Sequence, residues 1–224
     1  MKIILSPAKK MKMEQEAETL TTPVFMENTK ELMCWMQKLT YEKVKKLWAC
    51  NDKIAELNYE RFQNMDLTRN LTPAILSYEG VAYQYMAPSV FEDGEFDYVQ
   101  ENLRILSAFY GVVKPLDGVT PYRLEMQAKA KVNGTKDLYE YWGDKIYREV
   151  SDEDRVIINL ASKRIFKMRR PIFTAGRYIY HLCVRRNIGR KGCAERRLCE
   201  DGARRDGAVY GGTKCAGSAG DESV

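Results

Sequence analysis

The feature that most constrains the fold is a change of composition between Lys163 and Arg164. Residues 164–224 carry 14 Lys and Arg against 6 Asp and Glu, whereas residues 1–163 carry 22 against 25, so the net charges are +8 and −3. The later part also holds four of the six cysteines, nine of the 15 glycines and the single histidine. Within it, residues 196–212 (RRLCEDGARRDGAVYGG) show neither a helical nor a strand period. A folded core is therefore expected only in residues 1–163.

Short apolar runs in residues 1–163 predict the strands of a sheet. Each run is bounded by polar or turn-forming residues, which is typical of strands in a sheet interior. The runs are KIIL at 2–5, RILSAFYGVV at 104–113 and RVIINLAS at 155–162.

Apolar residues at helical spacing alternate with these runs. Residues 29–49 have this spacing, with Thr40 placed to cap a second turn. Either Asn51 or Asp52 can cap the next helix, and Asp137 begins a further one. The apolar face of the helix after Asn51 is predicted to comprise Ile54, Leu57 and Phe62. The fold class is therefore α/β, a single compact domain with helices packed around a central sheet, followed by a non-native tail.

The start of the chain indicates a cytoplasmic protein. MKIILSPAKK has four consecutive apolar residues before a proline and lysines, which is too short for the apolar region of a signal peptide. No later stretch reaches membrane-spanning length, so no membrane partner is expected.

Residues 1–163 contain no histidine. This excludes from them Ser–His and Cys–His nucleophile pairs and any His-ligated metal site. Cys34 and Cys50 lie singly on helical patterns, where a core position is expected. No metal and no cofactor are predicted, and a site must use Lys, Arg, Asp, Glu, Tyr, Ser or backbone groups.

Three stretches supply candidate site residues. SPAKK places Lys9 just after the first predicted strand, where α/β sheets often bind ligands. FYGVVKPLDG places Lys114 in a turn at a sheet edge, and PYRLEMQAK brings Arg123 near Glu125. One interpretation is a pocket of these four residues that holds an anionic group such as phosphate. The alternative is a set of solvated loop charges with an Arg–Glu pair.

Several motifs in residues 1–163 resemble one known family. They are LSPAKKM, LSYEGVAYQYMAPSVF, LRILSAFYGVVKPLDGVTPYRLEM, DLYEYWGDKI and VIINLASK, in this order. The set is similar to the YaaA family of peroxide-stress proteins. The resemblance implies a cytoplasmic α/β protein that protects against peroxide by limiting reactive iron and by binding double-stranded or branched DNA in a positively lined cleft.

The same resemblance suggests which residues bind. The phosphate or DNA contacts would be Lys9, Lys114 and Arg123, with Tyr110, Tyr122 and Glu125 beside them. A few well-placed cations can hold phosphates on a chain of slightly acidic net charge. No metal ligands accompany them, so an effect on iron would be indirect.

An enzyme or binding protein for a small phosphorylated or nucleotide-like ligand is the competing hypothesis. In that case Lys9 or Lys114 would act as a charge clamp, and Tyr110 or Glu125 would transfer protons.

The tail is interpreted as the product of a frameshift. When codons are read from their second base, LCEDGARRDGA at 198–208 becomes Y-A-K-M-A-R-G-E-M-V-R, which matches a Y-A-K-x-A-R-G-x-M-x-R segment of the family. Asp-Gly in this phase gives only Met or Thr, and it falls at both Met positions. The sequence therefore predicts a net gain of one base near codon 163, with residues 164–224 largely disordered.

The composition of the tail suggests two alternatives. An RGG-like nucleic-acid arm needs Gly-rich repeats with interleaved aromatic residues, and the tail has no such repeats. A metal loop around Cys193, Cys199 and Cys215 lacks paired C-x-x-C spacing.

Overall fold

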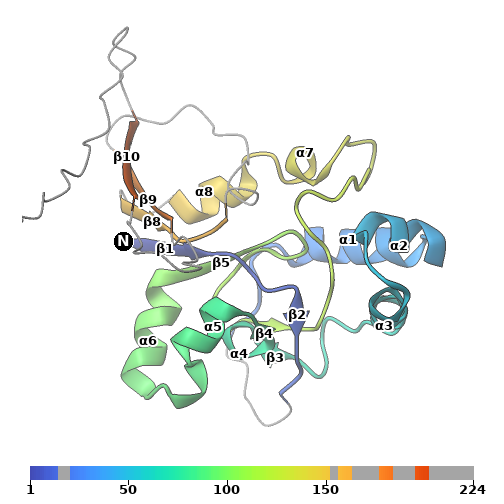
Figure 1. The fold of residues 1–224 in the computed structure, drawn as a ribbon, viewed down its shortest axis with the longest axis horizontal. Helices are drawn as coiled ribbons and strands as arrows, with labels where there is room; N and C mark the ends of the chain where they lie inside the picture. The colour runs from blue at the N-terminus through green and yellow to red at the C-terminus, as the bar shows by residue number, and fades with distance from the viewer. Residues whose placement is uncertain (15–20, 152–155, 163–176, 184–194, 202–224) are drawn as a thin grey trace, which may run out of the picture.

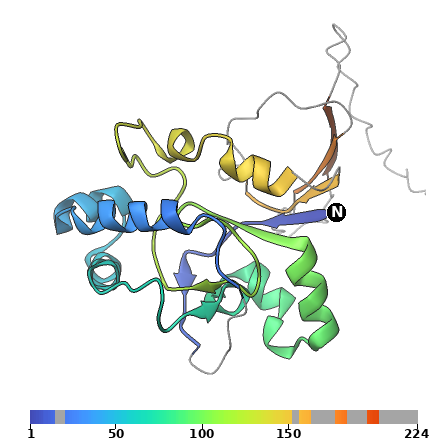
Figure 2. The same cartoon turned by 180° about the vertical axis from the view of Figure 1, so that it is seen from behind.

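A computed structural model of the chain shows a mixed sheet with helices on both of its faces (Figures 1 and 2). In both views α8 lies on one side of the sheet and α6 on the other. The structure describes residues 1–14, 21–151, 156–162, 177–183 and 195–201.

The strands belong to one main sheet and two short two-stranded pairings. In chain order they are β1 (Lys2–Leu5), β2 (Lys10–Met11), β3 (Thr72–Pro73), β4 (Tyr78–Glu79), β5 (Leu103–Ser107), β6 (Gly111–Val113), β7 (Gly118–Val119), β8 (Val156–Asn159), β9 (Arg177–Cys183) and β10 (Glu195–Asp201). Over the described residues the main sheet has the order β10-β9-β8-β1-β5-β6, and the short pairs are β2 with β4 and β3 with β7.

The helices are mostly short. They are α1 (Met26–Gln37), α2 (Tyr41–Trp48), α3 (Asp52–Gln63), α4 (Ala74–Ser77), α5 (Val81–Met86), α6 (Asp93–Asn102), α7 (Leu138–Trp142) and α8 (Lys145–Ser151), with a 3-10 turn at Pro88–Val90.

The N-terminal strand β1 lies at the centre of the main sheet. It pairs in parallel with β5 on one side and with β8 on the other, so that Ile4 lies opposite both Arg104 and Asn159. β6 is antiparallel to β5, whereas β9 is parallel to β8. The carboxyl ends of β1, β5 and β8 therefore meet at one edge of the sheet.

The strand predictions hold with one change. KIIL forms β1, and RVIINLAS contains β8. The run at 104–113 was predicted as one strand, but it divides into β5 and β6 around a turn at Ala108–Tyr110. The Ser107 hydroxyl accepts hydrogen bonds from the backbone N–H groups of Phe109 and Tyr110, at 3.0 and 2.9 Å, and these bonds stabilise the turn.

The helical pattern at 29–49 also divides. It becomes α1 and α2 because Thr40 has an extended backbone, and Thr40 is the N-cap residue of α2. The predicted apolar face of α3 is confirmed for Phe62 but wrong for Ile54 and Leu57, which are 37% and 48% exposed. The buried residues of α3 are Ala55, Asn58 and Phe62. A small residue and a polar residue on the buried face escape an argument based on apolar spacing.

The core contains many large apolar side chains. Its largest fully buried members include Trp142, Tyr110, Phe62, Phe109 and Ile105. The Trp142 indole N–H donates to the carbonyl of Ala108 at 2.9 Å, so its polar atom is paired. Cys34 was expected in the core but is exposed, and Cys50 is half-buried.

Of the tail, the structure describes only β9 and β10, which continue the main sheet beyond β8. The rest of residues 164–224, with Cys193 and Cys215, lies outside the described residues, so the prediction of a largely disordered tail stays a prediction. Among the residues that are described, no helix combines the length and apolar character needed to cross a membrane.

Candidate phosphate-binding site

A cavity of about 390 Å³ lies at the carboxyl ends of the parallel strands β1, β5 and β8. Chain segments that follow these strands, and one that follows β7, line it. The lining residues are Ser6, Pro7, Ala8, Lys9, Ala108, Tyr122, Arg123, Leu124, Glu125, Met126, Gln127 and Ser162. From β1 the chain builds β5 on one side and later β8 on the other, and such reversals of strand order are common ligand sites in α/β sheets.

The loop after β1 is fixed by three contacts. The Ser6 hydroxyl accepts a hydrogen bond from the Ser162 N–H at 2.8 Å, and the Ser6 carbonyl accepts one from the Tyr83 hydroxyl at 3.0 Å. A Cβ at Gly80 would lie 2.9 Å from the Cβ of Ala8, so only glycine allows this close approach. The loop that carries Lys9 is therefore held against α5 and against the residues after β8.

Arg123 and Lys9 are the cations of the cavity, and both contact Glu125. Lys9 Nζ lies 2.8 Å from Glu125 Oε1, and Arg123 Nη2 lies 3.6 Å from the same oxygen. The Arg123 side chain is only 13% exposed, and its Nε is buried without a hydrogen-bond partner in the described structure. A nearly buried guanidinium in the wall of a cavity is suited to bind an anion through its remaining N–H groups.

Tyr122 lies in the cavity wall and is oriented by a chain of hydroxyl groups. Its oxygen is 2.7 Å from Ser107 Oγ and 3.0 Å from the Tyr78 hydroxyl oxygen. Because Ser107 Oγ already accepts two backbone N–H groups, its own hydrogen points to Tyr122, whereas either of the Tyr122 and Tyr78 hydroxyls can donate to the other. Burial raises the pKa of Tyr122. These two contacts fix the Tyr122 hydroxyl in the cavity wall.

Tyr110 was predicted beside the site but lies beneath it. It is fully buried, and its hydroxyl accepts a hydrogen bond from the Thr120 N–H at 3.0 Å. Burial raises the pKa of Tyr110, so the hydroxyl stays protonated. The ring packs against Phe109 and Tyr122, with centroids 4.9 and 5.5 Å apart. Its role in this structure is packing.

Lys114 is not brought to the cavity. β6 runs antiparallel to β5, with Val113 opposite Ile105, so Lys114 lies near the opposite end of β5 from Ser107. There the Lys114 N–H donates to Asp117 Oδ2 at 2.8 Å. The predicted four-residue pocket is therefore reduced to Lys9, Arg123 and Glu125.

Sequence reasoning missed Ser6, Ser162 and Gln127 as lining residues. Ser6 follows the predicted strand at 2–5, and Ser162 is the last residue of the predicted run at 155–162. A signal was therefore present, because the residues after neighbouring parallel strands meet at one edge of a sheet. Nothing in the sequence showed that β1 and β8 are neighbours.

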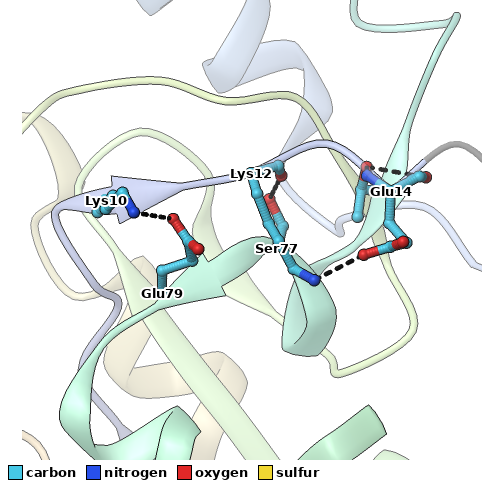
Figure 3. A network of polar contacts seen from close by, with 6 residues as sticks. Lys10, Lys12, Glu14, Ser77 and Glu79 are labelled. Atoms are coloured by element: carbon cyan, nitrogen blue, oxygen red, sulfur yellow. Dashed lines mark hydrogen bonds and ion pairs between the residues drawn. The ribbon is translucent and has the colours of Figure 1, made fainter.

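Two further lysines near Lys9 are paired outside the cavity (Figure 3). Lys10 Nζ lies 2.9 Å from Glu79 Oε2 across β2 and β4, and Lys12 Nζ lies 2.6 Å from Glu14 Oε2. Ser77 fixes this segment, since its hydroxyl donates to the Lys12 carbonyl at 2.8 Å. Neither lysine lines the cavity. Within the part of the chain that the structure describes, no group of three or more His, Cys, Asp and Glu is placed to hold a metal.

Comparison with known proteins identifies similar sequences over most of the chain. A family model described as "Peroxide stress protein YaaA" matches residues 1–185. A UPF0246 protein of Agathobacter rectalis is 60% identical over 168 residues, which are 75% of this chain and 68% of that protein. UPF0246 proteins of Desulfitobacterium hafniense and Lactiplantibacillus plantarum are 55% and 52% identical, over 79% and 76% of this chain and 70% and 69% of their own lengths.

Proposed function

Because the chain belongs to the family of the peroxide stress protein YaaA, we propose that it acts in the peroxide response by binding the phosphates of DNA. Binding would occur in the cytoplasm, at the cavity that Lys9 and Arg123 line. Double-stranded or branched DNA is the proposed partner, and any limitation of reactive iron would follow indirectly from this binding.

The observation that supports the proposal is the burial and incomplete hydrogen bonding of the Arg123 guanidinium. Its guanidinium is nearly buried at the carboxyl edge of the sheet, one nitrogen has no partner, and Lys9 stands at the rim with 62% of its side chain exposed. Arg and Lys in this arrangement bind phosphate oxygens through charge-assisted hydrogen bonds.

The test measures binding of fluorescent duplex and branched DNA by anisotropy at about 50 and 200 mM salt. Arg123→Gln and Lys9→Ala should each weaken binding and reduce the slope of log affinity against log salt by about 1. Lys114→Ala measures whether the binding surface extends to the other end of β5.

Lys46→Ala is the control, because Lys46 is an exposed lysine of α2 that does not line the cavity. Its binding should match that of the unsubstituted protein. Binding that ignores salt, or that is unchanged in both Arg123→Gln and Lys9→Ala, would contradict the proposal.

A small phosphorylated or nucleotide-like ligand is the second candidate. The shape of the cavity favours it, since about 390 Å³ is within the range of small-molecule sites. Apolar side chains of Ala8, Ala108, Leu124 and Met126 contribute to its wall. Of the proton-transfer groups considered for such a ligand, Glu125 lines the cavity and Tyr110 does not. Competition of a nucleoside monophosphate against labelled DNA tests this candidate.

We also infer that the tail results from a frameshift. The matches to the relatives leave about 30% of each relative and more than a fifth of this chain without a counterpart. A changed reading frame would leave an unmatched part in both this chain and its relatives. The family match ends at residue 185, so the position of the shift near Lys163 depends on the alternative reading phase alone.

A further inference from the structure

We propose that Glu125 occupies the anion position of the cavity in the unliganded protein, and that the cavity therefore selects a phosphate monoester, which carries more charge than the carboxylate it displaces. This inference rests on the proposed binding of phosphate at the cavity. It adds the class of phosphate that binds and the residue that opposes binding.

The carboxylate of Glu125 is surrounded by the donors that a phosphate would need. Oε1 lies 2.8 Å from Lys9 Nζ and 3.6 Å from Arg123 Nη2. Oε2 accepts a hydrogen bond from Gln127 Nε2 at 3.0 Å. Carboxylate and phosphate oxygens bind the same Arg and Lys groups in the same geometry. A ligand phosphate and the Glu125 carboxylate therefore compete for one set of donors.

Glu125 is placed so that its side chain can leave. It lies on the non-helical segment between β7 and α7, and its side chain is 26% exposed. The backbone is held separately, because the Glu125 carbonyl accepts a hydrogen bond from the Ala128 N–H at 2.8 Å. The contact with Arg123 is long, and Arg123 Nε stays unpaired within the described structure. Displacement therefore needs a change of rotamer and no movement of the chain.

The ion pair between Lys10 and Glu79 is a nearby comparison for the pair between Lys9 and Glu125. Its atoms are 2.9 Å apart and its side chains are 79% and 32% exposed, but it lies outside the cavity and is not among its lining residues (Figure 3). Glu125 differs because a second, nearly buried cation contacts it. This difference makes Glu79 the matched control for Glu125.

Charge then determines which phosphate can enter. A phosphodiester of DNA carries one negative charge, as the Glu125 carboxylate does, so exchanging the two gains little attraction. A phosphate monoester carries about −1.5 to −2 at pH 7. The cations Lys9 and Arg123 therefore favour a terminal phosphate, either at a DNA end or on a small molecule.

The experiment compares one labelled duplex with a 5′-phosphate and with a 5′-hydroxyl, bound by the full chain and its variants. The unsubstituted protein should bind the phosphate-ended duplex at least about fivefold more tightly. Glu125→Gln, which keeps the shape of the side chain, should tighten binding of both duplexes by about tenfold or more, whereas Glu79→Gln should leave both unchanged. Arg123→Gln should abolish the difference between the two ends.

The outcomes separate this inference from the proposed function. The inference is overturned if the two duplexes bind equally, if Glu125→Gln does not raise the affinity, or if Glu79→Gln raises it by the same factor. A salt-dependent loss of affinity in Arg123→Gln would still support phosphate binding in each of these cases. Unchanged binding in Arg123→Gln and Lys9→Ala overturns both. Competition by a nucleoside monophosphate indicates that a phosphate group suffices, and failure to compete assigns recognition to the DNA end. Thermal unfolding of each variant establishes that it is folded.

Discussion

At the scale of single residues, Gly111 leaves no room for a side chain. Its φ is +76°, and a Cβ there would lie 2.7 Å from Phe25 Cδ2 and 2.8 Å from Trp142 Cζ3. Gly111→Ala should lower the free energy of unfolding by about 2 to 4 kcal/mol, because backbone strain adds to overpacking. Urea unfolding measures the loss. Gly94→Ala is the control, since Gly94 on α6 has open space around it and should change stability by no more than about 1 kcal/mol, in the stabilising direction.

Asp117 gives a prediction about pH. Its Oδ1 accepts from the Thr21 hydroxyl at 2.5 Å, yet burial raises the pKa of the carboxyl above its ordinary value. The folded protein therefore holds this proton to higher pH than the unfolded chain does, and the contribution of Asp117 to stability falls as pH rises from about 4 through the raised pKa. The free energy of unfolding is measured for the unsubstituted protein and for Asp117→Asn at each pH. The first value minus the second should decrease over this window.

Asp66 should contribute to stability with the opposite dependence on pH. Hydrogen bonds from Thr68 lower the pKa of Asp66, so its contribution is present above about pH 4 and is lost as pH falls through the lowered pKa. The same difference measured for Asp66→Asn should increase as pH rises. A difference for Asp117→Asn that also increases with pH would contradict the assignment of its raised pKa to burial.

Single residues of the candidate site were predictable to different degrees. Lys9 was placed correctly because the end of a strand can be seen in KIIL followed by Pro7. Arg123 and Glu125 were placed together because they are two residues apart. Lys114 was placed incorrectly, because its position depends on β6 turning back along β5. The apolar run at 104–113 gives no sign of that turn.

At the scale of elements, the two predicted caps differ in their contacts. The Asn51 side chain accepts a hydrogen bond from the Ile54 N–H at 3.0 Å at the start of α3, whereas Thr40 makes no side-chain cap bond at the start of α2. Asn51→Ala should therefore lower the free energy of unfolding by about 1 kcal/mol. Thr40→Ala should cost less than half of that. Thermal unfolding measures both, and equal losses would show that the two caps are equivalent.

Elements with a strong local pattern were predictable, and those fixed by distant contacts were not. β1 and β8 are short apolar runs, and α3 begins at a recognisable cap. The face that α3 buries was mistaken because Asn58 is buried and satisfies its amide by donating to the Ile54 carbonyl at 2.7 Å. The two-residue strands β2 and β4 have no pattern of their own and exist because the segments they join are brought together.

At the scale of the whole molecule, the frameshift hypothesis makes a prediction about the gene. An extra base, an A in an A-rich run, should lie across the codons of Lys163 and Arg164, and its removal should continue the chain with Glu-Tyr. The repaired protein should be more soluble and unfold more cooperatively, because the family terminus would again cover the core. Nucleotide sequencing and calorimetry of the repaired chain measure the two parts.

The same measurements can refute the hypothesis. If the downstream codons do not encode Y-A-K-M-A-R-G in the other phase, residues 164–224 are the intended terminus. The nucleic-acid arm then becomes the leading interpretation of this basic segment. A repaired chain no more soluble or cooperative than the present one would show that the terminus does not protect the core.

The central position of β1 sets the order of events during synthesis. The strand leaves the ribosome first, but its second neighbour, β8, ends at Asn159, about 150 residues after Leu5. At elongation rates of about 5–20 residues per second, β1 therefore remains unpaired with β8 for roughly 8 to 30 s after it is synthesised. During this interval an apolar strand edge is open to other nascent chains and to chaperones. Synonymous codons that slow translation between β5 and β8 would lengthen this exposure without altering a single side chain.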